Sequence, residues 1–72
     1  MNHELEYSAD EARMQAVGYF RNAMTTKEGG LVDRYARRAE KWFAAERIAR
    51  RNGFVTIVSL GNGDFEIKAL VS

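Results

Sequence analysis

The sequence contains no cysteine and no proline, and its one histidine, His3, stands close to the N-terminus. Without cysteine the chain can form no disulfide, and it has no thiolate to ligate a metal or attack a substrate. A transition-metal site would also draw on imidazole and thiolate ligands that the chain mostly lacks. We therefore exclude the disulfide-stabilised and cysteine-dependent classes of protein, and we expect no metal site.

Long apolar runs are also missing. No run approaches the roughly 18 apolar residues of a membrane-spanning helix. The N-terminal letters MNHELEYSADE lack the basic and apolar regions of a secretory signal. These features predict a cytoplasmic protein with no membrane contact.

The groups that an enzyme needs are scarce. Catalysis requires a nucleophile beside a base, a metal, or paired carboxylates across a cleft. Ser8 is expected to cap a helix, and Ser59 falls in a predicted strand with no base beside it. The glycine-rich stretches EGGL and GNGD lack the spacing and the lysine of a phosphate-binding loop. We therefore predict no catalytic residue and no cofactor.

The composition that remains is that of one small folded domain. The chain has 72 residues, of which 46% are hydrophobic and 29% charged, as in ordinary globular proteins. No internal repeat or low-complexity segment divides it. A single domain, 1–72, is therefore expected.

The first predicted helix spans residues 9–24 and has a well-marked start. Ser8 is followed three residues later by Glu11, the pattern of a capping box. In that motif each side chain bonds to the backbone N–H of the other residue. Before it, residues 3–7 alternate polar and apolar side chains, which favours a short edge strand.

The second predicted helix spans residues 31–51. Gly29 and Gly30 precede it, and we expect them to adopt positive φ and turn the chain between the helices. The letters NGF follow it, so a left-handed cap at Asn52 or Gly53 should end the helix.

The C-terminal segment predicts a β-hairpin. The letters FVTIVSL and DFEIKALV flank GNG, and Asn-Gly is the strongest short signal for a hairpin turn. With Asn62-Gly63 as a two-residue turn, Leu60 faces Phe65 and Val58 faces Ile67 on one face of the ribbon.

In that register Val55, Ile57 and Leu70 form an apolar patch on the other face of the hairpin. Either the N-terminal segment covers this patch, or the patch is exposed and joins two copies or a partner strand. A homodimer through these residues is therefore one hypothesis.

Together the elements predict an α+β fold in the order (β)ααββ. Two helices pack on a C-terminal antiparallel β-hairpin, and residues 3–7 are a candidate third strand. A third strand would help, because a two-stranded ribbon is marginally stable alone.

Positive charge is concentrated on the second helix. Residues 31–53 carry seven Lys and Arg against three Asp and Glu, a net charge of +4 on a chain whose total is +1. One side of the helix is apolar, with Trp42 and Phe43 as core anchors. The opposite side carries a basic stripe with one apolar member: Arg34, Arg37, Arg38, Lys41, Ile48 and Arg51.

Three interpretations of the basic stripe are open. It is a solvated helix face, a docking surface for an acidic protein, or a nucleic-acid contact. Arginine is enriched at the energetic centres of protein interfaces, which favours docking. Several phosphate contacts would give salt-sensitive nucleic-acid binding. The nearly neutral total charge argues against that third interpretation.

Glu46 stands among apolar positions of the second helix, where a bare carboxylate would be costly. It is expected to pair with Arg50 at i+4, or with Arg13 or Arg21 of the first helix. The alternatives are a functional carboxylate with a raised pKa and a contact across an oligomer interface.

We therefore predict a small non-catalytic protein-binding module, an inhibitor or adaptor that engages an acidic surface through the basic stripe. Direct binding of DNA or RNA by the same stripe, and a structural homo-oligomer, are the alternatives. In size and composition the chain is similar to small accessory proteins that block or bridge a larger partner, such as phage-encoded anti-CRISPR inhibitors. No sequence motif carries that likeness.

Overall fold

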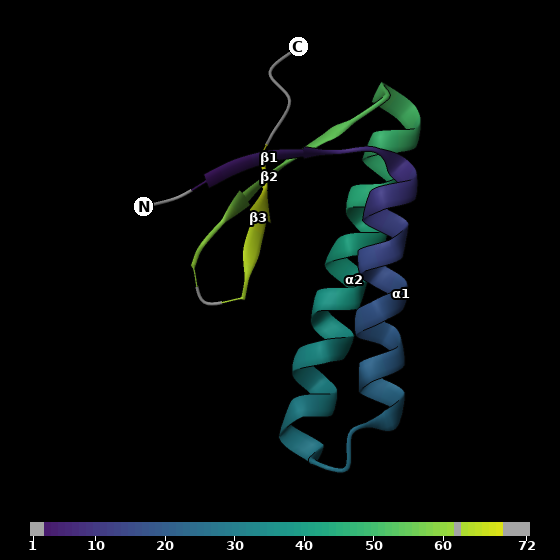
Figure 1. Ribbon diagram of the computed structural model, residues 1–72, viewed down its shortest axis with the longest axis vertical. Coiled ribbons are helices and arrows are strands. Elements are labelled where there is room, and N and C mark those ends of the chain that lie inside the picture. Colours follow the sequence, from purple (N-terminus) through teal and green to yellow (C-terminus); the bar gives the residue numbers. More distant parts are fainter. Residues whose placement is uncertain (1–2, 62, 69–72) are drawn as a thin grey trace.

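A three-stranded antiparallel sheet lies beside one end of a pair of helices in the computed structural model (Figure 1). The structure describes residues 3–61 and 63–68. The elements follow the order β1 (His3–Tyr7), α1 (Ala9–Thr25), α2 (Gly29–Asn52), β2 (Val55–Ser59) and β3 (Phe65–Ile67). This arrangement confirms the predicted α+β fold, and residues 3–7 form the third strand. Neither helix is long and apolar enough, within the described residues, to cross a membrane.

The start of α1 is the capping box that the sequence predicts. The backbone N–H of Ser8 donates to Glu11 Oε1 over 2.9 Å, and Ser8 Oγ accepts from the backbone N–H of Glu11 over 3.2 Å. Two N-terminal donors of the helix are thereby satisfied. The helix ends at Thr25, where Thr26 adopts an extended conformation.

The helix α2 begins earlier than expected. Gly29 and Gly30 form its first turn, so the prediction that they make the break is wrong. The connection consists instead of residues 26–28, and the carbonyl of Glu28 accepts from the backbone N–H groups of Leu31 and Val32. Glycine lowers the stability of a helix, but only two residues of the first turn are affected here, and neither occupies a core position.

The C-terminus of α2 agrees with the predicted cap. Gly53 adopts the left-handed conformation with φ 92°, and its N–H donates to the carbonyl of Ala49 over 2.7 Å. Of the two expected cap positions, Asn52 and Gly53, the glycine is the one used, because it carries no Cβ to oppose positive φ.

The hairpin register differs from the expected one by one residue. Ser59, and not Leu60, pairs with Phe65, and Ile57, not Val58, pairs with Ile67. The loop is closed by the N–H of Leu60, which donates to the carbonyl of Asp64 over 3.1 Å. A slip of one residue exchanges the two faces of a strand. The observed register places Ile57 and Phe65 on the same buried face, which explains why it is preferred.

The core lies where the sheet meets α2. Trp42 is 5% exposed and packs edge-on against Tyr7, with ring centroids 4.9 Å apart. Its other side contacts Phe65, whose ring centroid is 4.4 Å away. The helices approach one another through small residues, because the buried positions besides Trp42 on α1 and α2 are all alanine: Ala12, Ala16, Ala39, Ala45 and Ala49.

The register also removes the expected apolar patch on the hairpin. Val55 and Ile57 are 1% and 3% exposed and belong to the core of the chain itself. They are therefore not available as a dimer surface, and of the two alternatives for this patch, covered or exposed, the exposed one is wrong for these two residues. Leu70, the third member, lies outside the described residues.

Candidate functional site

Four cations of α2 surround one hollow at the surface. Arg34, Arg37, Arg38 and Lys41 stand at i, i+3, i+4 and i+7 and so share one side of the helix. With Asp64 of the hairpin they line a hollow of about 600 Å³, which we call the basic hollow. Among the described residues, the five that line it carry a formal net charge of +3, from four cations and one carboxylate.

Lys41 joins the basic hollow to the sheet. Its Nζ donates to Asp64 Oδ1 over 3.0 Å and to the carbonyl oxygen of Phe65 over 2.9 Å. The hydrogen bond from Lys41 lowers the pKa of Asp64, and the backbone N–H of Phe65, which also donates to this carboxylate, lowers it further. Asp64 therefore stays ionised and neutralises part of the charge of Lys41.

Arg38 is held between α1 and the hairpin loop. Its Cζ lies 5.9 Å from the ring centroid of Tyr19, a cation–π distance. A Cβ placed on Gly63 would come within 3.1 Å of the Arg38 guanidinium. These two neighbours restrict the side chain, so its charge is presented in a defined position.

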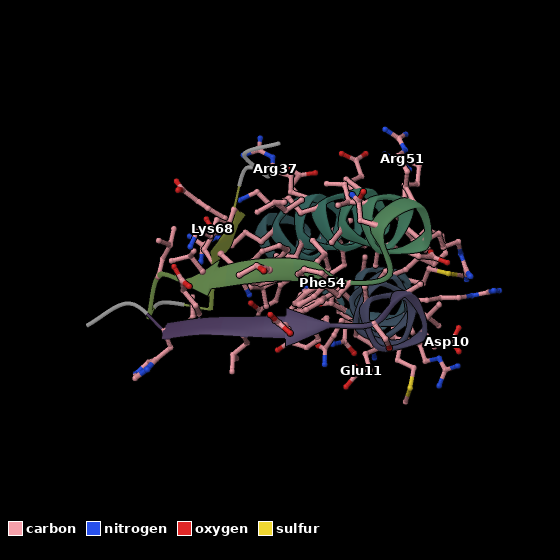
Figure 2. The ribbon with its side chains drawn as sticks, turned by 90° about the horizontal axis from the view of Figure 1, so that it is seen from above. Asp10, Glu11, Arg37, Arg51, Phe54 and Lys68 are labelled. Atoms are coloured by element: carbon pink, nitrogen blue, oxygen red, sulfur yellow. The ribbon has the colours of Figure 1, made fainter. Side chains whose placement is uncertain are left out.

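Arg34 and Arg37 are exposed and form no ion pair within residues 3–61 and 63–68. Arg37 projects from α2 on the side away from α1 (Figure 2). A guanidinium offers a planar fork of donors that matches a carboxylate or phosphate in bidentate geometry. The basic hollow can therefore bind an anion through two guanidinium groups that form no ion pair in the described part of the chain, beside the restricted one of Arg38.

Two members of the predicted stripe are not brought into the basic hollow. Ile48 is half-buried and packs against the core cluster. Arg51 stands in the last turn of α2, where the negative end of the helix dipole favours a cation. The hollow thus combines the other four predicted residues and adds Asp64.

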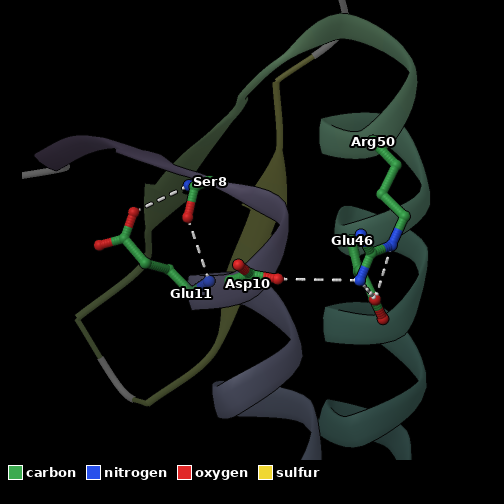
Figure 3. Close-up of polar contacts among 5 residues, drawn as sticks. All are labelled: Ser8, Asp10, Glu11, Glu46 and Arg50. Atoms are coloured by element: carbon green, nitrogen blue, oxygen red, sulfur yellow. Dashed lines mark hydrogen bonds and ion pairs between the residues drawn. The ribbon is translucent and has the colours of Figure 1, made fainter.

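Glu46 takes the pairing expected at i+4. Its Oε2 accepts from Arg50 Nη2 over 2.6 Å and from Nε over 3.0 Å (Figure 3). Arg50 Nη2 also lies 3.9 Å from Asp10 Oδ1 on α1. The carboxylate thereby connects through Arg50 to the start of α1 and takes no part in the basic hollow.

In the described part of the chain, no three His, Cys, Asp or Glu side chains are placed to hold a metal ion.

Sequence reasoning missed the contribution of the hairpin to this site. Asp64 reaches Lys41 because the loop contains one residue more than a two-residue turn, and local patterns favoured the shorter turn. The contact of Arg38 with Tyr19 depends on how α1 packs against α2, which no spacing within one helix reveals.

No protein-family model, no curated protein and no solved structure matches this chain.

Proposed function

We propose that this chain is a small non-catalytic protein-binding module whose basic hollow receives an acidic segment of a larger partner. The observation that carries this proposal is the placement of Arg34, Arg37 and Arg38 around one concave surface. Among the described residues, Arg34 and Arg37 form no ion pair. Carboxylate side chains of a partner would therefore form bidentate hydrogen bonds with their guanidinium groups.

The limited extent of the charge favours an acidic protein segment over a nucleic acid. Residues 31–53 carry a net charge of +4, whereas the rest of the chain carries four Lys and Arg against seven Asp and Glu, a net charge of −3. A long polyanion would extend beyond the hollow and meet those carboxylates. Nucleic-acid-binding domains are usually more basic as a whole, whereas this chain has a net charge of only +1.

The proposed action on the partner is occlusion or bridging. A chain that contributes binding without catalysis changes its partner by covering a surface or by connecting two molecules. In either case Arg34 and Arg37 would act as anchors, because arginine is enriched among the residues that dominate interface energies.

A binding assay with defined probes tests the proposal. Fluorescence anisotropy would compare a labelled oligoglutamate peptide with single-stranded and duplex DNA over a series of salt concentrations. We expect the peptide to bind, and Arg34→Glu/Arg37→Glu to weaken it by about tenfold or more, since charged hydrogen bonds contribute about 1.5–3 kcal/mol each.

The matched control is Lys27→Glu/Arg47→Glu, which reverses two exposed charges outside the basic hollow. It changes the total charge equally and should alter peptide affinity by about twofold at most. Equal loss in both variants would show that the hollow has no special role. Tight DNA binding with a steep salt dependence would replace our proposal by the nucleic-acid alternative.

A further inference from the structure

The helix α1 distributes its apolar residues in an unusual way. Its buried positions are the small residues Ala12 and Ala16, both 0% exposed. Its large apolar residues point to solvent: Met14 is 75% exposed, Met24 72%, Phe20 53% and Val17 38%. A helix that serves only its own core normally shows the opposite pattern. The α1 outer face, defined by these four large residues, is therefore suited to a contact beyond the chain.

One edge of the α1 outer face is open to close approach. Asp10, Arg13, Met14, Val17, Gly18 and Arg21 line a shallow hollow of about 460 Å³. A Cβ added to Gly18 would meet no atom within 4 Å, so the helix backbone is uncovered there. A second helix can therefore pack close to α1 along the row of Asp10, Met14, Val17 and Arg21, which share one side of the helix at i, i+4, i+7 and i+11.

The charges on this face are arranged for self-pairing. Asp10 and Arg21 line the same hollow. They are separated by eleven residues, or about 16 Å along the helix. Asp10 is 92% exposed in its side chain, and its contact with Arg50 is a long one of 3.9 Å. Arg21 forms no ion pair within the described residues.

In an antiparallel pair of α1 helices, Asp10 and Arg21 of each copy both gain an ion-pair partner. If Asp10 faces Arg21 of a second copy, two-fold symmetry repeats that ion pair at the other end of the contact. The same register brings Met14 against Val17 of the second copy. The charged residues that line the hollow are Asp10, Arg13 and Arg21, a net charge of only +1, so the hollow complements a copy of itself rather than a strongly charged partner.

We propose that the α1 outer face forms a homodimer through antiparallel two-fold pairing of α1 with a second copy of this chain. The interface is independent of the basic hollow. Arg37 projects from α2 away from α1, whereas Asp10 and Glu11 project from α1 in other directions (Figure 2). A dimer would therefore display two basic hollows and could bind a partner with two acidic segments more tightly than one chain does.

Sedimentation equilibrium over a range of concentrations tests this dimer. A single helix pair gives a small interface, so we expect association to be evident at about 0.5 mM chain. Val17→Glu should raise the dissociation constant about a hundredfold, because a charge would be buried without a partner. The matched control is Leu60→Glu, since Leu60 is 37% exposed and lies on the hairpin, far in sequence from α1.

Charge exchange tests the pairing itself. Asp10→Arg alone and Arg21→Asp alone should each weaken the dimer, because each places like charges opposite one another. The double variant Asp10→Arg/Arg21→Asp should restore it, and a mixture of the two single variants should form heterodimers. Circular dichroism would verify that every variant keeps its helices.

Three results would overturn the inference. One is a wild-type chain that stays monomeric at about 0.5 mM, the concentration at which we expect this helix pair to associate. Another is a dimer that Leu60→Glu dissociates and Val17→Glu does not, which would place the interface elsewhere. The third is a double variant no better than the single ones, which would exclude the antiparallel pairing.

Discussion

Lys41 Nζ lies 3.0 Å from Asp64 Oδ1 and 2.9 Å from the carbonyl oxygen of Phe65, so one side chain joins α2 to the start of β3. The ion pair is half-exposed, with 44% of the Lys41 side chain and 43% of the Asp64 side chain accessible. A pair of that exposure contributes little to stability. Its larger effect is electrostatic, because Asp64 offsets positive charge at the edge of the basic hollow.

Replacing Asp64 by asparagine is therefore expected to strengthen anion binding. The change raises the formal charge of the lining residues from +3 to +4 and keeps a polar side chain near Lys41. We expect oligoglutamate affinity to rise about two- to tenfold, since an exposed charge contact is worth a fraction of a kcal/mol to about 1 kcal/mol. Glu66→Gln removes a carboxylate close by that does not line the hollow, and should have a smaller effect. A loss of affinity in Asp64→Asn would mean that the carboxylate positions Lys41 for binding.

Stability should fall in acid because of two hydrogen-bonded carboxylates. The backbone N–H of Ser8, and then its hydroxyl, lowers the pKa of Glu11 below the ordinary value of 4.5. The hydrogen bond from Lys41, and then the N–H of Phe65, lowers the pKa of Asp64 below the ordinary value of 3.8. A lowered pKa in the folded state stabilises the fold above the ordinary value, and this contribution disappears as pH falls through the lowered one.

Urea unfolding at a series of pH values measures this effect. The free energy of unfolding should decline below about pH 4.5 and continue to decline as the two carboxylates protonate. The double variant Glu11→Gln/Asp64→Asn keeps polar side chains at both sites and should show a flatter decline. An unchanged decline would assign the acid sensitivity to other groups.

Replacement by alanine should have opposite effects on the stability of the fold at two glycines whose surroundings are equally open. A Cβ would meet nothing within 4 Å at Gly18 or at Gly53, but Gly53 has φ +92° and Gly18 lies inside α1. Gly18→Ala should stabilise the fold by about 0.5–1 kcal/mol, the difference in helix propensity. Gly53→Ala should destabilise it by about 1–2 kcal/mol, the cost of a left-handed residue with a Cβ.

Thermal unfolding of both variants gives these two values. Measurement on a Val17→Glu background removes any contribution from self-association. Equal responses of the two glycines would contradict the assignment of Gly53 as a left-handed cap.

Trp42 should be the most sensitive position of the core. It is the only tryptophan of the chain, and it contacts both Tyr7 of β1 and Phe65 of β3. Trp42→Ala should cost about 3–5 kcal/mol, which is a large part of the stability of a small domain. Circular dichroism melting would show an unfolded or nearly unfolded chain. Phe20→Ala, at a residue 53% exposed, should cost less than about 1 kcal/mol; a similar loss in both would contradict the location of the core.

Sequence patterns predicted correctly the contacts that form between residues close in sequence. The capping box of Ser8 and Glu11 spans three residues, so its hydrogen bonds depend on no other part of the fold. The cap at Gly53 likewise follows from the freedom of glycine at positive φ. The pairing of Glu46 with Arg50 follows from the helix repeat.

Predictions failed where burial by distant elements outweighed a local preference. Asn62-Gly63 favours a two-residue turn, yet the hairpin shifts by one residue and places Ile57 opposite Ile67. The shift is decided by the apolar area that Ile57 and Phe65 bury, since a change of register exchanges the two faces of a strand. The alternative in which Val55 and Ile57 are exposed fails for the same reason.

The sequence by itself determined the helices, the strands, their order and the basic character of α2. Hydrophobic periodicity, capping residues and charge each depend on residues near one another in the sequence. Only the tertiary structure decided which residues meet. It placed Asp64 beside Lys41, placed Arg38 over Tyr19, and turned alanine rather than methionine of α1 toward the core. These contacts join residues far apart in sequence, and they depend on how the sheet and both helices bury apolar surface together.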